Sequence, residues 1–289
     1  MRIRPAILAL LALLSIACSR KTPPSEFSKL SEEATYKLLA FSPVAASGQG
    51  LHKYNGQDLD RELDNPGFRF IQAQRNYAVD LHKRLGQFDK DALSPEDRAD
   101  YDILDYQIGL TLFDTDVAAS WRRSPQTYVE LLGSAVFNPF VLEYAPKEER
   151  YRHIIARLEK FPNFVDSARR QLSNVPAIWA KVAVGENAGN IALIDKDIRE
   201  GAPASIRAAY DAAAAPALDA LRGLTRFLET ELPQRSRRDL SDDWRLGPDQ
   251  YATKFKLALA TDRTPDQVLA DAETRLKQVR AKMLELSLP

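Results

Sequence analysis

The chain has 289 residues, with 40 Lys and Arg residues against 40 Asp and Glu residues, so its formal net charge is zero. This length is enough for one large domain or two small ones. The composition lacks the basic stripe that binding to a phosphate backbone requires, which argues against nucleic acid as a partner. Cys18 is the only cysteine, so a disulfide within the chain is excluded.

The N-terminal residues predict a bacterial secretory signal. Arg2 and Arg4 supply a positively charged region, residues 6–14 an apolar region, and residues 15–17 a small-residue exit. Because cysteine follows at once, residues 1–17 resemble a lipoprotein signal peptide, and we expect Cys18 to be the lipidated first residue of the mature protein. Removal of the signal leaves 38 basic residues against 40 acidic ones, a net charge of −2.

Two alternatives to lipidation remain open at this stage. Ser15 stands where lipoprotein signals usually carry leucine, and Ser15-Ile16-Ala17 also fits an ordinary signal peptidase site, which would leave Cys18 unmodified. An uncleaved membrane anchor is the other alternative, but the apolar run is shorter than the ~20 residues that a bilayer crossing needs. Lipidation would remove an exposed free thiol from an oxidising compartment, and we therefore favour it.

The predicted location is the cell envelope. Ser19, rather than aspartate, follows the cysteine and favours sorting to the outer membrane, with the protein facing the periplasm. Residues 18–25 are polar and carry two prolines, so they predict a short tether. Residues 26–289 form the predicted folded domain.

Apolar residues recur at spacings of three and four through most of this domain, which predicts helices. The predicted fold class is all-α, an irregular multi-helix domain of roughly eight to ten helices. Residues 42–67 are predicted to be a loop, and the polar flanks of Asn55-Gly56 argue against a hairpin there. The expected helices span 26–41, 68–88, 95–112, 146–172 with a break near Pro162, 175–199, 203–232 with a bend near Pro216, 250–260, and the segment that starts at 264.

Two helix starts are strongly marked in the sequence. Ser94 precedes Pro95 and two acidic residues, as expected for an N-cap followed by the first helical turn. Thr264 and Gln267 have the spacing of a capping box around Pro265. The last helix carries an apolar side that includes Leu269, Leu276, Val279 and Met283.

No motif in the sequence specifies a reaction. The histidines, His52, His82 and His153, form no His-Glu-x-x-His pair around which zinc could bind. Glu149 and His153 are four residues apart, and we interpret them as a surface ion pair. The aspartates of one helix are interpreted as a solvated face: Asp97, Asp100, Asp102 and Asp105. We therefore predict no catalytic, cofactor-binding or metal-binding residue.

Several segments in order resemble the bacterial family labelled domain of unknown function 885, and the similarity spans essentially the whole mature chain. They are Phe41-Ser-Pro-Val-Ala-Ala-Ser-Gly48, Leu85-Gly-Gln-Phe-Asp89, Leu93-Ser-Pro-Glu-Asp-Arg98, Asp100-Tyr-Asp-Ile-Leu104, Arg157-Leu-Glu-Lys-Phe-Pro162, Gly247-Pro-Asp-Gln-Tyr251 and Leu257-Ala-Leu-Ala-Thr-Asp-Arg-Thr-Pro265.

Members of that family look like zinc metallopeptidases of the gluzincin type, whose zinc element lies in the C-terminal half. The resemblance therefore implies zinc and a peptide substrate for full-length members. The present sequence stops at Pro289, within or just after its last predicted helix. The zinc ligands and the general-base glutamate have no counterpart in it, so no catalytic residue carries over.

Two interpretations follow. In the first, the chain is the N-terminal, non-metal-binding half of a lipid-anchored peptidase-like protein, not catalytic alone, with a missing C-terminal half as its partner. In the second, it is a self-sufficient α-helical lipoprotein that binds a partner or ligand without catalysis. The first predicts an exposed apolar patch on the last helix, whereas the second predicts that this patch is buried.

Overall fold

The computed structural model of the protein describes residues 25–235 and 244–288. Within these residues the fold is all-α and irregular, with ten helices of seven residues or more, which confirms the predicted fold class. The helices are α2 (Glu26–Ala40), α3 (Pro43–Gly48), α4 (Phe68–Leu85), α5 (Pro95–Phe113), α6 (Ser120–Arg123), α7 (Pro125–Val141), α8 (Lys147–Leu158), α9 (Phe161–Gln171), α10 (Ala177–Ala192), α11 (Arg199–Gly201), α12 (Arg207–Arg226), α13 (Leu232–Arg235), α14 (Pro248–Leu259) and α15 (Pro265–Ser287).

Shorter elements connect the helices. Two strands, β1 (Lys53–Tyr54) and β2 (Gln57–Asp58), form a hairpin that leads into the 3₁₀ turn η1 (Leu59–Arg61). A second 3₁₀ turn, η2 (Lys90–Ala92), precedes α5. Three π-helical segments extend longer helices: η3 (Asp114–Ala118), η4 (Leu193–Ile198) and η5 (Phe227–Glu231).

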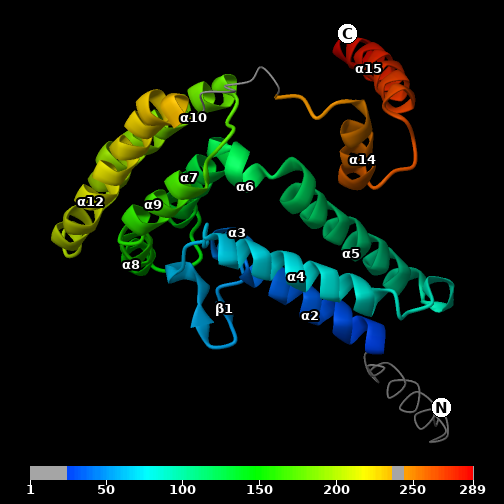
Figure 1. Ribbon diagram of the computed structural model, residues 1–289, viewed down its shortest axis with the longest axis horizontal. Coiled ribbons are helices and arrows are strands. Elements are labelled where there is room, and N and C mark those ends of the chain that lie inside the picture. The colour runs from blue at the N-terminus through cyan, green and yellow to red at the C-terminus, as the bar shows by residue number, and fades with distance from the viewer. Residues whose placement is uncertain (1–24, 236–243, 289) are drawn as a thin grey trace, which may run out of the picture.

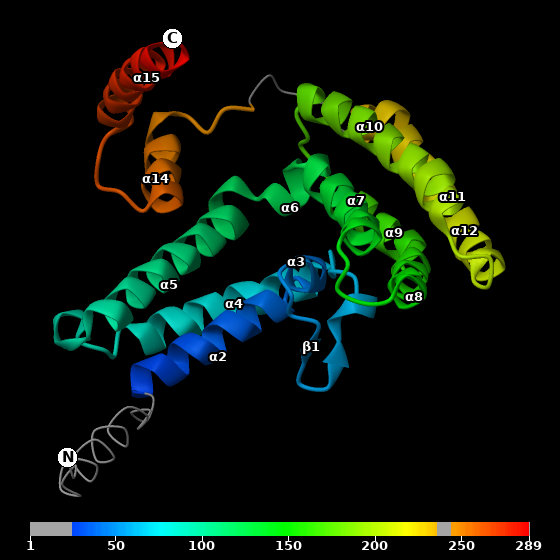
Figure 2. The same cartoon turned by 180° about the vertical axis from the view of Figure 1, so that it is seen from behind.

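Helices α2, α4 and α5 lie side by side and form one arm of the molecule (Figures 1 and 2). The predicted apolar stripes of these helices meet in one buried cluster that includes Phe27, Leu81, Leu85 and Ile108. The Ser94 hydroxyl accepts a hydrogen bond from the backbone N–H of Asp97 at 3.1 Å, which confirms the predicted N-cap of α5.

Helices α7 to α12 form the second arm around a larger core (Figure 1). The helix predicted over residues 146–172 is interrupted near Pro162, as expected. Helix α8 ends at Leu158, and α9 begins at Phe161 with Pro162 in its first turn. Helix α12 continues through Pro216. This core gathers large side chains that are fully buried, among them Leu132, Tyr151, Ile154, Phe161, Tyr210 and Phe227.

Helix α7 is the centre of this arm, and it was not predicted. Its buried residues form one stripe at spacings of three and four: Pro125, Tyr128, Val129, Leu132, Ala135, Val136 and Pro139. The apolar residues Phe137 and Val141 lie on the exposed side and obscure this stripe in the sequence. Gly133 lets α10 approach closely. A Cβ at this position would lie 2.5 Å from Oδ1 of Asn190, whose Nδ2 donates to the Val129 carbonyl at 2.8 Å.

The predicted loop over residues 42–67 was wrong, because this segment holds α3, the hairpin and η1. The strands pair antiparallel, with Lys53 opposite Asp58 and Tyr54 opposite Gln57. Asn55 and Gly56 have positive φ angles of 48° and 80°, as two-residue hairpin turns of the Asn-Gly type require. The turn chemistry therefore decided the structure, although the polar flanks had argued against strands.

The C-terminal helices pack differently from each other. Leu257 of α14 sits directly over Gly109 of α5, where an added Cβ would lie 2.6 Å from a leucine methyl group. The predicted capping box of α15 is present, with Thr264 and Gln267 each bonding the other's backbone N–H. Helix α15 lies beyond α14 at the edge of the molecule (Figure 2), and none of its described residues is buried.

Within residues 25–235 and 244–288, no helix has both the length and the apolar character that crossing a membrane demands.

The close approach of α7 and α10 gives a matched pair of tests in two helical glycines. Gly133→Ala should lower the free energy of unfolding by about 1–2 kcal/mol, because the new methyl displaces Asn190 from its hydrogen bond. Gly185→Ala meets nothing within 4 Å and should raise the free energy of unfolding by about 0.5–1 kcal/mol through helix propensity. Urea titration of both variants measures the two values. Equal effects of the same sign would contradict this packing.

Candidate functional site

Helix α8 carries three buried polar residues, Arg150, His153 and Arg157, at spacings of three and four. This spacing places them on one face of the helix, which we call the α8 polar face. Buried polar groups are stable when they are hydrogen-bonded. Together the three contact η1, α7 and the segment that follows α7, so the partners of this face define the site.

Arg157 is 0% exposed, and its guanidinium donates hydrogen bonds to three backbone carbonyls. Its Nε donates to Glu62 at 3.1 Å, one Nη to Leu59 at 3.2 Å and the other to Ala135 at 2.9 Å. Lys160 adds bonds to the Arg61 carbonyl and the Glu62 carboxylate. These contacts fix η1 against α7 and α8.

Arg150 holds the segment that follows α7. Its guanidinium donates to the carbonyls of Pro139, Phe140 and Ala145 at distances of 2.8 to 3.0 Å. Tyr144 lies within this segment, and its hydroxyl is 3.0 Å from Nδ1 of His153. The Tyr144 ring is stacked with His153 and with His52, with ring centres 5.9 and 4.7 Å apart.

Asp60 is the acidic partner of the α8 polar face and is 5% exposed. Its Oδ1 accepts a hydrogen bond from the Ser47 hydroxyl at 2.6 Å and lies 2.9 Å from Nδ1 of His52. Its Oδ2 lies 4.0 Å from Nδ1 of His153. Asp58 caps η1, because its Oδ1 accepts from the Asp60 backbone N–H at 3.2 Å.

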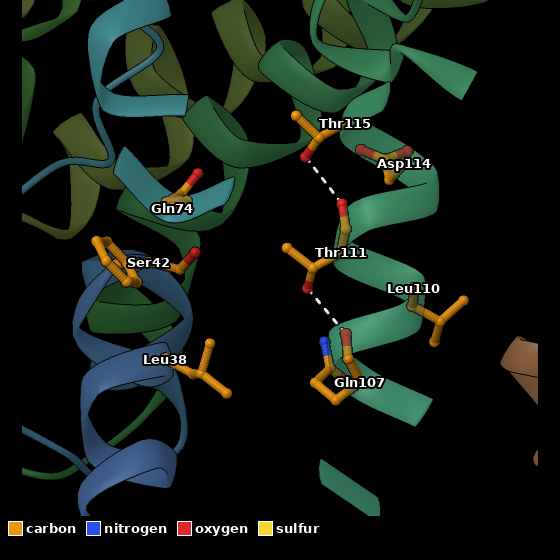
Figure 3. A pocket seen from close by; sticks show the side chains of 9 residues that line it. Leu38, Ser42, Gln74, Gln107, Leu110, Thr111, Asp114 and Thr115 are labelled. Atoms are coloured by element: carbon orange, nitrogen blue, oxygen red, sulfur yellow. Dashed lines mark hydrogen bonds between the residues drawn. The ribbon is translucent and has the colours of Figure 1, made fainter. Parts of the chain in front are cut away.

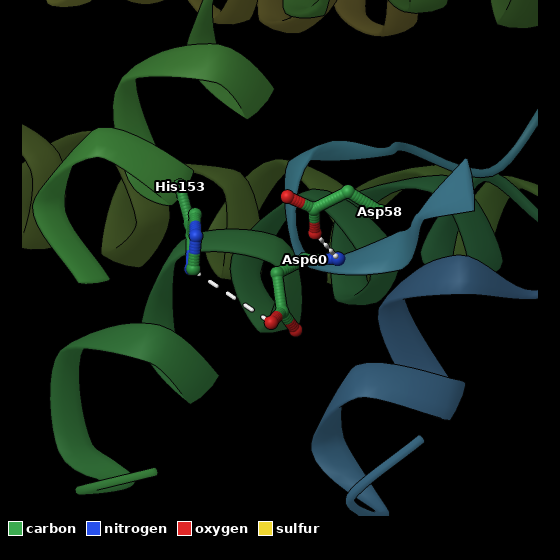
Figure 4. A group of neighbouring side chains, drawn as sticks. All are labelled: Asp58, Asp60 and His153. Atoms are coloured by element: carbon green, nitrogen blue, oxygen red, sulfur yellow. Dashed lines mark hydrogen bonds and ion pairs between the residues drawn. The ribbon is translucent and has the colours of Figure 1, made fainter. Parts of the chain in front are cut away.

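Asp58, Asp60 and His153 therefore converge from β2, η1 and α8 (Figure 4). One ligand-type atom from each lies within 4.8 Å of the others. Two carboxylates and an imidazole are groups that can bind a metal ion or exchange protons. We refer to these three residues as the Asp-Asp-His cluster.

Burial dominates the electrostatics of the cluster. Burial lowers the pKa of His153 below its usual 6.5, so the imidazole is neutral at pH 7. The Asp60 and Asp58 carboxylates act in the opposite direction and raise this pKa, but burial has the larger effect. Burial also raises the pKa of Tyr144 to about 12, which keeps that hydroxyl protonated. Burial lowers the pKa of Arg157, opposed by the acidic groups around it.

The cluster was not predicted from the sequence. The interpretation of Glu149 and His153 as a surface ion pair was wrong, because His153 is 5% exposed and contacts Tyr144 and Asp60 instead. Asp58 and Asp60 lie in the segment taken for a loop. The available signal was Asp-Leu-Asp directly after an Asn-Gly turn, but nothing local linked it to α8.

The other candidates behave as the sequence indicated. His82 is exposed and lies 3.5 Å from Asp105, while Asp102 pairs with Lys90. Asp97 accepts hydrogen bonds from Ser28 and from Ser25 of the α2 N-terminus. The aspartates of α5 form no metal-type group within the described part of the chain. Cys18, the predicted lipidation site, lies outside the described residues.

Two pockets flank the segment between α2 and α4. A pocket of about 370 Å³ lies between the C-terminal ends of α2 and α5 (Figure 3). Its threonines, Thr111 and Thr115, bond to carbonyls of their own helix. The other polar residues of the pocket lining are Ser42, Gln74, Gln107 and Asp114.

The second pocket, of about 460 Å³, lies between α3 and α7 and includes Asp64, Glu130 and Asn138. Burial raises the pKa of Asp64, while the bond from the Val44 backbone N–H and the attraction of Arg157 oppose this shift. A carboxyl with a raised pKa in a pocket is a binding or proton-transfer candidate. This pocket is a weaker candidate than the Asp-Asp-His cluster, because its wall carries the acids Asp64 and Glu130 but no histidine or basic side chain.

The apolar side of the last helix is exposed, as the first of the two interpretations predicted. Leu269, Leu276, Val279 and Met283 are 59, 50, 52 and 64% exposed. Leu284, Leu286 and Leu288 are more than half exposed as well. We call Leu269, Leu276, Val279 and Met283 the α15 apolar face.

The fold and the site define an all-α, irregular multi-helix protein with a buried polar cluster at its centre. Its fold is similar to a solved structure described as a putative lipoprotein of unknown function from Shewanella oneidensis, with a TM-score of 0.74 and 20% sequence identity. The similarity covers 91% of this chain and 47% of that one, so the chain spans about half the length of this neighbour.

The sequence profile of the family described as bacterial protein of unknown function (DUF885) matches residues 43–287. The chain belongs to this family. No curated protein matches it in sequence.

Proposed function

We propose that this protein is a lipid-anchored component of the bacterial cell envelope that supplies the N-terminal part of a peptidase-like fold, the part without the catalytic zinc ligands. In this proposal the α15 apolar face docks further polypeptide of the same family, and the chain is not catalytic without it. Cys18 attaches the assembly to the outer membrane on the periplasmic side. The peptide substrate and the zinc chemistry belong to the docked part.

The observation that carries this proposal is the α15 apolar face. Its four members recur at spacings of three, four and seven, which places them on one side of α15. In a self-contained monomer such a side faces the core, because each large apolar side chain gains about 1.5–3 kcal/mol by leaving water. Here this side faces solvent along a helix of 23 residues.

The extent of the structural similarity supports the same conclusion. The chain accounts for 47% of its neighbour from Shewanella oneidensis, so that protein has as much polypeptide again beyond the matched region. Polypeptide of that size from the same family would be large enough to cover the α15 apolar face. We propose that such polypeptide covers this face, either as part of the same chain or as a separate chain.

Lipid attachment is tested at one residue. Cells that express the wild-type chain and are grown with an alkyne-labelled fatty acid should yield a labelled protein, because the Cys18 thiol would carry the lipid. The Cys18→Ala variant should lose the label entirely, while Ser19→Ala, with the thiol intact, should keep it. Absence of label from the wild type, or equal label on Cys18→Ala, would rule out the anchor.

Docking is tested by photo-crosslinking in intact cells. A benzophenone amino acid in place of Leu276 should give a light-dependent product with a polypeptide that matches the same family, because Leu276 lies at the centre of the α15 apolar face. The same amino acid in place of Gln278, on the opposite side of the exposed helix, should give little product. Crosslinking to a second copy of the chain, to lipid, or to nothing would contradict the proposal.

A further inference from the structure

We propose that Asp58, Asp60 and His153 form a binding site for one divalent transition-metal ion, of the Zn²⁺ type, which fastens the β1–β2 hairpin and η1 to α8. This structural ion would be distinct from the zinc that the proposed function assigns to the docked polypeptide. The inference does not depend on that function, because every residue that carries it lies in the described part of this chain.

The donor set suits such an ion. An imidazole nitrogen together with carboxylate oxygens is a common ligand combination for zinc, whereas calcium takes six to eight oxygens. Zinc–ligand bonds of about 2.0–2.2 Å allow two ligand atoms to lie at most about 4.4 Å apart. The observed separations reach 4.8 Å, so a small rotation of the partly exposed Asp58 side chain would close the site.

The hydrogen bonds of the cluster leave one carboxylate oxygen of Asp60 available. Oδ1 of Asp60 is engaged by Ser47 and His52, while Oδ2 faces Nδ1 of His153 at 4.0 Å, beyond hydrogen-bonding distance. The same Nδ1 lies 3.0 Å from the Tyr144 hydroxyl, so a metal ion bound at this nitrogen would replace that hydrogen bond. The side chain of His153 is more than nine-tenths buried, which holds the imidazole beside the two carboxylates.

The surroundings have the features of a metal site's supporting residues. Ser47 and His52 orient the Asp60 carboxylate, and Tyr144 orients the His153 ring by stacking. Such partners raise metal affinity by fixing the ligands in place.

The direct test is zinc titration of the full chain by calorimetry. All proteins carry Cys18→Ser, so that the thiol cannot bind zinc. The parent should bind one zinc ion, and Asp58→Asn and His153→Gln should each weaken binding at least tenfold because each removes a ligand. His82→Gln, which removes an exposed histidine beside Asp105, should bind zinc like the parent.

A second readout separates ligand loss from misfolding. Asp58 is partly exposed, so Asp58→Asn should keep the parent's circular dichroism spectrum and melting temperature without metal. Zinc should then raise the melting temperature of the parent but not that of Asp58→Asn. A parent that binds no zinc, or a folded Asp58→Asn protein that binds it as tightly as the parent, would overturn the site. Either result leaves the crosslinking of α15 unaffected.

Discussion

The complete burial of the Arg157 guanidinium is the constraint on which the centre of this structure depends. A buried cation is tolerated only where its donors are paired, and Arg157 pairs with the carbonyls of Leu59, Glu62 and Ala135. Those carbonyls belong to η1 and α7, which the sequence separates widely. Loss of the guanidinium would remove a donor from all three carbonyls, and the Leu59 carbonyl would keep its bond from the Glu62 backbone N–H.

This arrangement explains why the Asp-Asp-His cluster lies where it does. Arg157 and His153 are four residues apart on α8, so the residue that holds η1 and the histidine that faces it share one helix face. The carboxylates of Asp58 and Asp60 approach His153 because the backbone beside them is fixed by Arg157. The proposed cation would be a second link between η1 and α8, in addition to the hydrogen bonds of Arg157.

Much of the fold could be predicted from the sequence, because most helices here have one apolar stripe and clear start signals. The Ser94 and Thr264 caps are local features of this kind. Helix α7 was missed although its buried residues form one stripe, because the exposed apolar residues Phe137 and Val141 obscure that stripe in the sequence. The hairpin was missed because its strands are two residues long and too short for an alternating pattern.

The candidate site was harder to predict than the fold. The local spacing of Glu149 and His153 indicated a surface pair, whereas the environment of His153 is set by Tyr144 and by a hairpin distant in sequence. Buried polar clusters depend on tertiary contacts, which a helical period does not encode. The apolar residues of α15, in contrast, were visible in the sequence, and only the structure could tell whether anything covers them.

The protein thus has two distinct features. Its centre holds buried polar residues that are hydrogen-bonded to one another and to the backbone, and its outer helix α15 has an apolar side that is exposed within the described residues. The first feature would fix the scaffold, and the second is the surface that we propose for assembly. Variants of α15 can therefore alter docking without disturbing the centre.

The most direct measurement is hydrogen exchange of the η1 amides in Arg157→Lys, with Arg152→Lys on the exposed side of α8 as the control. The amides of Leu59 and Glu62 are hydrogen-bonded in the structure, and a lysine cannot reproduce the planar set of donors that holds this turn. Their exchange should accelerate roughly tenfold or more in Arg157→Lys, while α4 and α5 keep their protection. Unchanged exchange at Leu59 and Glu62 would contradict the central role of Arg157.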